Sequence, residues 1–391
     1  MGEKSVEVIV AGHICLDILP DFAQNASNGD MLMPGKLTAV GPATLAVGGA
    51  VANAGLALHR LGIATKLVGK VGDDHLGKLI LQILREADPV LADEMLVTRE
   101  AGTSYSIVVS LPDVDRVFFH YTGANDVFRA TDLHPEHFRD ARLFHVGYPP
   151  LLRLMYADGG QTFAALLREL KAYGLTTALD MALPDPGTEA SVVNWNDWLS
   201  RVLPYVDLFF PTSDEILAML GYTRDGAYPP LSGSLLSEVA ERLLAKGAAV
   251  VALKLGSDGL YMRTTSEMRR LAALGRCMPV DLRAWQDREL LVPCFQVEVA
   301  GTTGAGDCTI AGYLTGLLRE LAPEKVMTGA VAVGAFSVET MDATSGVPAW
   351  QAVWARVEYG WPRRPLELEL PADWRYDQAA SIWYGPHDQR A

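Results

Sequence analysis

The residues best suited to chemistry in this chain form one short segment, which begins at Gly301, ends at Asp307 and reads Gly-Thr-Thr-Gly-Ala-Gly-Asp. Apolar residues at helical spacing follow it, so we expect a helix to begin near Ala305. The free N–H groups and the dipole at the start of a helix favour a bound anion. A carboxylate there would repel an anion, unless it faced a hydroxyl group and took its proton as that oxygen attacked phosphorus. The segment therefore predicts phosphoryl transfer to a hydroxyl group.

The alternative is that the glycines only form a tight turn and that Asp307 only supports the start of the helix. A bare G-x-G-D string would favour that alternative, because short glycine motifs are common by chance. The complete segment is more specific, since it resembles the C-terminal signature D-T-x-G-A-G-D of the PfkB/ribokinase family of carbohydrate kinases. The resemblance implies that Asp307 is the catalytic base, that the amides of Gly304, Ala305 and Gly306 form the anion hole, and that Thr302 helps to bind the nucleotide.

The composition is that of an ordinary soluble protein of 391 residues, with 49% hydrophobic and 20% charged residues. A net charge of −14 argues against nucleic acid or an anionic membrane as the main partner. The four cysteines show no C-x-x-C or zinc-ligand spacing. No leader-like segment and no run of about 18 apolar residues is present, so we expect no membrane contact and a reduced, cytoplasmic setting.

Strand-like and helical segments alternate along most of the chain. The strand-like runs lie at residues 6–19, 65–68, 143–146, 176–179, 206–210 and 248–253, and the helical runs at residues 50–61, 76–85, 163–173, 214–220 and 235–245. Such alternation indicates βαβ units in a mostly parallel sheet, which binds ligands at the carboxyl ends of its strands. With the resemblance, this predicts a ribokinase-like, doubly wound α/β domain over residues 1–350.

Two parts of the chain interrupt the alternation. Residues 20–47 are polar and glycine-rich, whereas residues 105–111 and 117–121 form strand-like runs around a Pro-Asp turn. A plain surface hairpin would explain these runs. The resemblance implies instead a small β lid over the sugar, built from about residues 18–47 and 95–125, which in the family often forms a dimer contact.

The last part of the chain, residues 351–391, forms an extension rich in tryptophan and proline. Five of the eight tryptophans lie after Val347. Because disordered tails are poor in aromatic residues, we expect this extension to pack on the domain or on a neighbouring subunit. A homodimer is therefore possible through either the lid or the extension.

Residues that could hold the acceptor lie near the start of the chain. Gly48 and Gly49 precede a helical run that contains Asn53, which resembles the family's N-terminal signature G-G-x-x-x-N-x-A. Glycines let a ligand approach the backbone, and an amide both donates and accepts hydrogen bonds. The alternative is a loop-to-helix junction with an amide cap. Asp17 follows the first strand and by resemblance holds substrate hydroxyls, although it could also be a polar turn residue; we regard His13 nearby as structural.

Two further motifs concern the nucleotide and the metal. The segment Lys-Leu-Gly-Ser-Asp-Gly that begins at Lys254 would by itself be a hairpin turn. It resembles the family's L-G-x-x-G loop, which implies that Gly256 and Gly259 lie against ATP and that Lys254 is a weaker charge partner. Glu215 matches the family's N-x-x-E motif, whose glutamate holds Mg²⁺ through water, but Thr212 replaces the asparagine. A simple helix cap explains these two residues equally well.

The motifs together predict an ATP-dependent and Mg²⁺-dependent kinase that phosphorylates a hydroxyl, expected to be a primary one, of a sugar or sugar derivative. Gly301 replaces the first aspartate of the family signature, which helps to hold a monovalent cation, so activation by potassium is doubtful. Two alternatives stay open. One is a kinase of the same fold for a nucleoside or another non-sugar alcohol, and the other is a catalytically silent member that binds nucleotide or sugar in a regulatory role.

Overall fold

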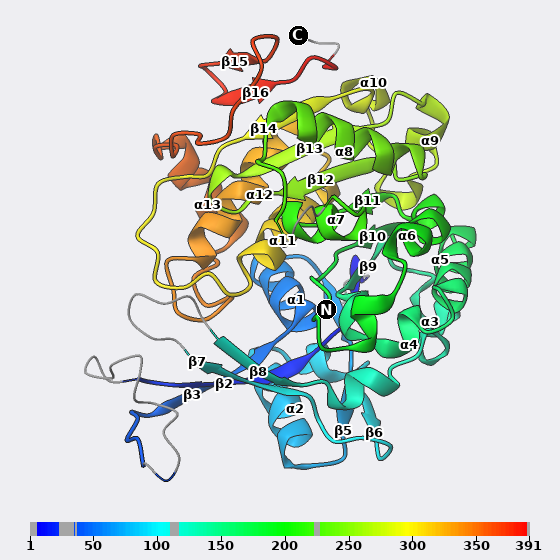
Figure 1. The fold of residues 1–391 in the computed structure, drawn as a ribbon, viewed down its shortest axis with the longest axis vertical. Coiled ribbons are helices and arrows are strands. Elements are labelled where there is room, and N and C mark those ends of the chain that lie inside the picture. Colours follow the sequence, from blue (N-terminus) through cyan, green and yellow to red (C-terminus); the bar gives the residue numbers. More distant parts are fainter. Residues whose placement is uncertain (1–5, 23–34, 36, 110–116, 223–226, 389–391) are drawn as a thin grey trace, which may run out of the picture.

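A ten-stranded sheet forms the centre of the protein (Figure 1). The computed structural model describes residues 6–22, 35, 37–109, 117–222 and 227–388, and the strand order is β15-β16-β14-β13-β12-β11-β10-β9-β1-β4. The neighbouring strands from β12 to β4 are parallel. They are β1 (Val8–Gly12), β4 (Thr65–Val68), β9 (Leu143–Gly147), β10 (Thr176–Leu179), β11 (Leu208–Phe209) and β12 (Val250–Lys254).

The other edge of this sheet is antiparallel and includes the C-terminal extension. Strands β13 (Leu260–Thr264) and β14 (Glu289–Val292) continue the sheet from β12. The extension then adds β16 (Ile382–Tyr384), which pairs with β14, and β15 (Arg375–Asp377) outside it. The two added strands are red at the top of Figure 1. The extension therefore packs on its own domain.

Helices cover both faces of the sheet (Figure 1). Along β1 the side chains of Val8 and Val10 enter one hydrophobic core, and those of Ile9 and Ala11 enter the other, as a strand's alternation requires. The arrangement confirms the doubly wound α/β fold. Within the described ranges, no helix has the length and apolar character needed to cross a membrane.

The helices divide between the two faces as follows. The first face carries α1 (Ala50–Arg60), α2 (His75–Ala87), α9 (Met268–Ala272), α10 (Leu282–Trp285), α11 (Ala305–Leu318), α12 (Pro323–Ser337) and α13 (Trp350–Glu358). The second face carries α3 (Pro135–Phe138), α4 (Arg153–Tyr156), α5 (Gln161–Ala172), α6 (Trp195–Val202), α7 (Ser213–Met219) and α8 (Gly233–Ala245).

A second, four-stranded sheet stands apart from the main one and has the order β3-β2-β7-β8. Its strands are β2 (Cys15–Pro20), β3 (Ala43–Gly48), β7 (Tyr105–Val109) and β8 (Val117–Tyr121). The two strand-like runs expected here are thus β7 and β8, whereas the Pro-Asp turn between them lies outside the described residues. A short pair, β5 (Lys70–Gly72) and β6 (Leu96–Thr98), lies separately.

The single strand predicted over residues 6–19 is wrong, because the chain changes sheets within it. Strand β1 ends at Gly12, and β2 begins at Cys15 in the second sheet. Gly12 has a φ of +129°, and a Cβ added there would lie 2.3 Å from the carbonyl oxygen of Gly147. Only glycine fits this close approach, which lets the chain leave the main sheet. A continuous apolar pattern does not reveal such a break.

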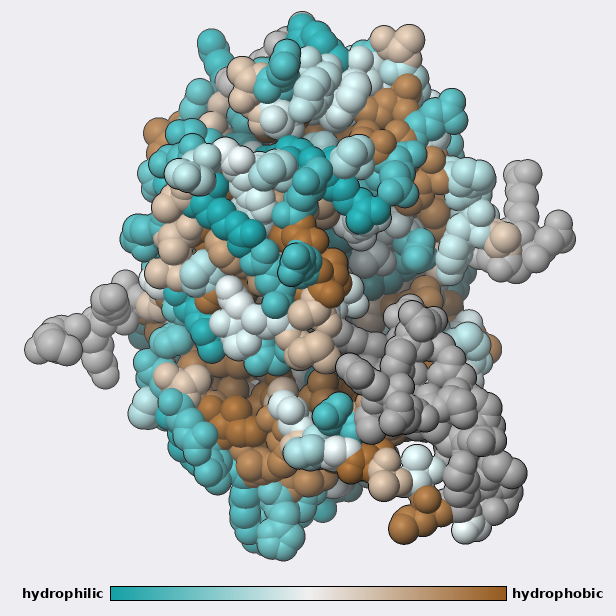
Figure 2. Space-filling model, turned by 90° about the vertical axis from the view of Figure 1, so that its left-hand side faces the viewer, coloured by the Kyte–Doolittle hydropathy of each residue, from teal (hydrophilic) through white to brown (hydrophobic). Residues whose placement is uncertain are grey.

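The outer strand of the second sheet, β8, exposes apolar side chains. Phe118 and Phe119 are 53% and 51% exposed. In Figure 2 the brown, apolar surface gathers towards the lower end of the molecule, where Figure 1 shows the second sheet. An exposed edge strand offers unpaired backbone groups to another chain. The homodimer stays a prediction, with β8 as one candidate surface.

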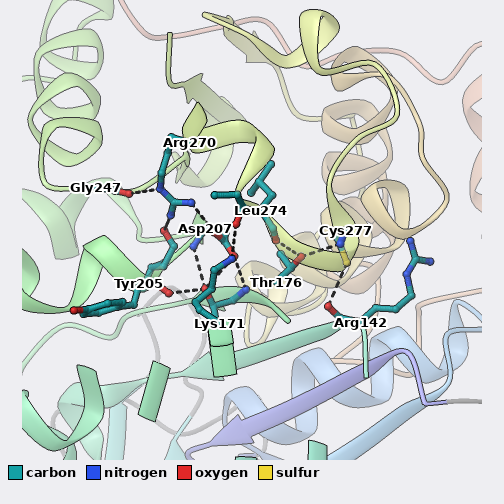
Figure 3. A network of polar contacts seen from close by, with 12 residues as sticks. Arg142, Lys171, Thr176, Tyr205, Asp207, Gly247, Arg270, Leu274 and Cys277 are labelled. Carbon is teal, nitrogen blue, oxygen red and sulfur yellow. Dashed lines mark hydrogen bonds and ion pairs between the residues drawn. The ribbon is translucent and has the colours of Figure 1, made fainter. Parts of the chain in front are cut away.

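A buried polar network lies at the amino ends of the parallel strands (Figure 3). Asp207, directly before β11, accepts hydrogen bonds from Lys171 Nζ at 2.6 Å and from the Thr177 N–H at 2.9 Å through Oδ2, and from Arg270 Nη1 at 2.7 Å through Oδ1. Both of its carboxylate oxygens are therefore satisfied. Such a site has a structural role, because it joins α5, β10 and α9 and leaves no oxygen free for a ligand.

Candidate active site

The start of α11 forms the centre of the site. The helix begins at Ala305, as expected, and Gly304 before it adopts a left-handed φ of 73°. A Cβ at Gly304 would lie 2.3 Å from the Cβ of Ala343, so the turn requires glycine. The Ala305 N–H donates to the carbonyl oxygen of Thr302 at 3.3 Å and closes this turn. The glycine turn thus presents the amino end of α11, which favours anions, to the carboxyl edge of the main sheet.

Asp307 lies in the first turn of α11 and is 1% exposed. Its Oδ2 accepts hydrogen bonds from Asn53 Nδ2 at 3.0 Å and from the Tyr148 hydroxyl at 2.7 Å. Its Oδ1 has no hydrogen-bond partner among the described residues. Burial raises the pKa of Asp307, although Lys254 and the two hydrogen bonds oppose that change. A carboxylate that is held through one oxygen and free at the other can accept a proton from a bound hydroxyl.

Tyr148 was not predicted as a site residue. It follows β9 directly and has a left-handed φ of 63°, a conformation that is costly for a non-glycine residue and concentrates at functional sites. Its hydroxyl orients Asp307, which lies 159 residues later in the chain. The sequence feature that could have indicated Tyr148 as a site residue was its position just after the predicted strand at residues 143–146.

A buried ion pair lies beside the glycine turn. Lys254, the last residue of β12, places Nζ 2.6 Å from Oδ1 of Asp180, which directly follows β10. A Cβ at Gly306 would lie 3.4 Å from the same Nζ, so the lysine borders the start of α11. Burial alone would lower the pKa of Lys254, but the carboxylates of Asp180, Glu215 and Asp307 raise it, and the lysine stays charged. Lys254 was predicted only as a weaker charge partner of the nucleotide, and Asp180 was not predicted.

Several polar atoms of this site remain unsatisfied, in contrast to those of the Asp207 network. Within the described residues, Oδ1 of Asp307, Oδ2 of Asp180 and Oδ1 of Asn53 are buried and have no hydrogen-bond partner. Buried polar atoms in folded proteins are nearly always paired, so an unpaired group needs an explanation. Their concentration at one edge of the sheet indicates a place for the polar groups of a ligand.

The residues expected to hold the acceptor pack together before α1. A Cβ at Gly48 would lie 2.0 Å from Oδ2 of Asp17, and Gly49 has a left-handed φ of 86°. Asp17 lies on β2 and, because burial raises its pKa, takes up a proton more readily than an exposed aspartate. Asn53 follows on α1 and connects this region to Asp307. The structure thus brings together all four residues predicted for the acceptor side.

Two histidines that were not predicted extend this region towards the second sheet. Nε2 of His13 lies 3.4 Å from Nε2 of His120 on β8, and the His13 ring centroid is 6.0 Å from that of Tyr148. Burial lowers the pKa of His13 to about 3, so its ring is neutral at physiological pH. His13 was expected to be structural, because a lone histidine beside a strand usually is. The sequence does not show that a second histidine comes from a distant strand.

A cavity of about 350 Å³ adjoins the ion pair. Lys254, Gly306 and Thr302 are among the residues that line it. Apolar side chains of α12 and of the segment after β14 line the rest, together with the loop that contains Gly256 and Gly259. The residues predicted for the nucleotide side therefore border one cavity, whose lining combines polar and apolar residues.

Glu215 forms the helix cap that was considered as the alternative. Its Oε2 accepts a hydrogen bond from the Thr212 N–H at 2.7 Å, and its own N–H donates to Thr212 Oγ1 at 3.2 Å. The carboxylate still lies near enough to the ion pair to contribute to the raised pKa of Asp180, of which burial is the largest cause. Glu215 and the unpaired oxygen of Asp180 are hard oxygen donors, which fit Mg²⁺.

Comparisons with known proteins agree with this geometry. The model of the pfkB family of carbohydrate kinases matches residues 10–350. The 2-dehydro-3-deoxygluconokinase of Bacillus subtilis is 26% identical over 323 residues, which cover 80% of this chain and 87% of that protein. Fructokinase-2 of Zea mays is 26% identical over 322 residues, 80% of each protein.

The fold is also that of solved ribokinase structures. The ribokinase of Arabidopsis thaliana, complexed with ribose and ATP, superposes with a TM-score of 0.66 at 18% identity, over 90% of this chain and 98% of that chain. The family model spans most of the sequence, and the expected signature residues meet at one edge of the sheet. This protein is therefore a carbohydrate kinase and belongs to the pfkB family.

Proposed function

We propose that the protein transfers the γ-phosphoryl group of ATP to a hydroxyl, expected to be a primary one, of a sugar or sugar derivative. The observation that carries this proposal is the free Oδ1 of Asp307, buried beside the start of α11 and opposite the Lys254–Asp180 pair. A base with one free oxygen next to an anion site suits an alcohol acceptor and a phosphoryl donor.

In the proposed mechanism, Asn53 and Tyr148 hold Asp307 through Oδ2, so that Oδ1 takes the proton of the attacking hydroxyl. The amides of Gly304 and Gly306 and the charge of Lys254 stabilise the negative charge that develops on the transferred group, and the Ala305 N–H joins them when it exchanges its 3.3 Å bond to Thr302 for the anion. Bound Mg²⁺, held partly through Glu215, would neutralise charge on the phosphates. Placement and electrostatics supply the catalysis, and no covalent intermediate is needed.

The acceptor would lie between the second sheet and the start of α1. Asp17 and the unpaired Oδ1 of Asn53 offer acceptors to sugar hydroxyls, and Gly48 and Gly49 allow the ring to approach the backbone. The second sheet would then serve as the lid. The two relatives support a sugar or sugar derivative as the acceptor, since their names give a dehydro-deoxygluconate and fructose as their substrates.

A coupled assay of ADP release tests the proposal. The purified protein with Mg-ATP would be presented with free sugars, sugar acids, sugar phosphates and nucleosides. Turnover on one sugar or sugar acid supports the proposal and identifies the acceptor class. Turnover on a nucleoside alone would contradict it, as would binding of ATP and sugar without any turnover, which is the behaviour of a silent, regulatory member.

The Tyr148 hydroxyl should set the acid limb of the pH dependence. Its hydrogen bond favours the charged form of Asp307, so Tyr148→Phe should raise the pKa of Asp307 beyond the increase that burial causes. The base must be deprotonated, and as the pH falls, activity should be lost at a higher pH in the variant than in the wild type. Profiles of kcat/KM against pH would test this, with the surface change Tyr173→Phe as a control. An unmoved acid limb would contradict the assigned contact.

Activation by potassium should be weak. Gly301 offers no carboxylate, and its N–H donates to the carbonyl oxygen of Val338 at 3.2 Å. We expect kcat/KM to change little when potassium replaces tetramethylammonium at constant ionic strength. Gly301→Asp restores the family residue and should introduce potassium dependence. A steep activation of the wild type by potassium would refute this expectation.

A further inference from the structure

The C-terminal extension lies against one wall of the cavity. The Gln296 N–H donates to the carbonyl oxygen of Pro362 at 2.9 Å, and the Arg364 N–H donates to that of Cys294 at 2.7 Å. Residues 362–364 therefore run antiparallel to residues 294–296, with a bridge between Phe295 and Arg363. Cys294 and Phe295 line the cavity, so the extension forms the layer directly behind this wall.

The extension also contacts a second segment of the cavity lining, the loop that adjoins Cys294 through a contact of 3.3 Å between Cys294 Sγ and the carbonyl oxygen of Gly256. The Glu367 N–H donates to Oδ1 of Asp258 at 2.9 Å, and Asp258 belongs to the loop whose Gly256 and Gly259 line the cavity. Only a few residues separate this contact from that of Arg364 with Cys294. The extension thus contacts two adjoining segments of the cavity lining, residues 294–295 and the loop that contains Gly256 and Gly259.

Aromatic packing fixes the extension at this place. The Trp361 ring stacks on Phe295 with centroids 4.4 Å apart, and the Arg356 guanidinium lies 3.6 Å from the Trp361 centroid. Trp361 Nε1 donates to the carbonyl oxygen of Gln296 at 2.9 Å. The Arg363 guanidinium lies 3.7 Å from the Phe295 centroid and donates to the carbonyl oxygen of Pro293. Arg356 and Arg363 are therefore engaged in packing and do not point to a ligand.

Arg364 differs from these two arginines because it lines the cavity itself. Its Nη2 lies 2.8 Å from Oε1 of Glu367, but the two side chains are 45% and 69% exposed. An exposed ion pair contributes little free energy, so the guanidinium can exchange this partner for a ligand anion at small cost. The other cation that lines the cavity, Lys254, already pairs with Asp180. Arg364 is thus available to a polyanion.

We propose that the C-terminal extension is part of the nucleotide site and that Arg364 binds the phosphate chain of the nucleotide. This inference rests on the proposed function, which puts ATP in this cavity. Arg364 lies beyond residue 350, where the family match ends, so none of the family's motifs assigns this contact. Its guanidinium presents several donors in a planar fork, the geometry that matches phosphate oxygens.

Isothermal titration of the full-length protein with ATP and, separately, with adenosine tests the contact. Arg364→Gln should raise the Kd for ATP roughly tenfold, as the loss of one hydrogen-bonded charge implies, and leave the Kd for adenosine unchanged. Glu367→Gln, which removes the competing carboxylate, should bind ATP at least as tightly as the wild type. Thermal unfolding of both variants would show that the fold is retained.

The outcomes separate this inference from the proposed function. An equal loss for ATP and adenosine would overturn it, because Arg364 would then only support the cavity wall, and an unchanged Kd for ATP would overturn it as well. Ala335→Leu, which fills the cavity from α12, should abolish ATP binding whether or not Arg364 contacts the phosphate chain. If that variant bound ATP normally, the position proposed for the nucleotide would itself be wrong, and the role of Arg364 would fail with it.

Discussion

Asp307→Asn should reduce kcat by roughly 10²–10⁴-fold, the contribution of a positioned general base. Its amide can still accept hydrogen bonds from Asn53 and Tyr148 through its oxygen, so the geometry around α11 should persist. What the variant loses is the free carboxylate oxygen that would take the proton. Replacing a buried carboxylate by a neutral amide also removes a desolvated charge, so the protein should stay folded.

Steady-state kinetics with the acceptor found in the assay would measure this effect. The Kd for ATP should stay close to the wild-type value, because the nucleotide cavity is unchanged. Asp140→Asn, at a side chain that is 92% exposed, is the matched control and should retain full activity. If Asp307→Asn kept more than a tenth of the wild-type kcat, Asp307 would not be the base.

The part of the site that lies within one segment was readable from the sequence. Gly304, Ala305, Gly306 and Asp307 are consecutive, so their spacing alone places an anion site beside a carboxylate. Gly48, Gly49 and Asn53 likewise share one loop and one helix turn. The relative positions of these residues follow from the local backbone, because the start of a helix fixes the directions of the side chains that follow it.

The rest of the site comes from separate strands and could not be assembled in advance. Tyr148, Asp180 and Lys254 lie at the carboxyl ends of β9, β10 and β12. In the sheet β9 pairs with β10, and β11 lies between β10 and β12. A prediction of strands and helices does not give that order. Asp180 and Asp207 illustrate the difficulty, because each adjoins a short apolar strand, but only Asp180 follows its strand and keeps an unpaired oxygen.

The same limit applies to the fold. The alternation of strands and helices predicted the main parallel sheet, because each helix and strand buries its own apolar pattern. The short strands β15 and β16 were not predicted, because three-residue strands carry no periodicity and depend on the free edge of β14. Such short strands are determined by tertiary contacts, here those that the aromatic residues of the extension make with the rest of the domain.

Lys254→Met should destabilise the protein as well as inactivate it. The change leaves Asp180, which is fully buried, without its cation, and breaking a buried ion pair in this way costs about 3–5 kcal/mol. Loss of the lysine beside Gly306 should also lower kcat by roughly 10²–10³-fold, as the removal of one group that stabilises the developing charge does. Urea denaturation would give the free energy of unfolding, and the coupled assay would give kcat.

The double variant Lys254→Met/Asp180→Asn separates the two effects. Removing both charges should restore most of the lost stability and leave the enzyme inactive, because the penalty arises from the unpaired carboxylate whereas catalysis needs the cation. The pH dependence has a definite sign. In Lys254→Met, burial without the lysine raises the pKa of Asp180 in the folded state far above its value in the unfolded state. The folded protein therefore binds this proton more tightly, and the loss of stability in the variant should grow as the pH rises and shrink as the pH falls. Equal stability of the single and double variants at neutral pH would show that Asp180 takes up a proton once Lys254 is removed, and the unpaired carboxylate would then not be the source of the lost stability.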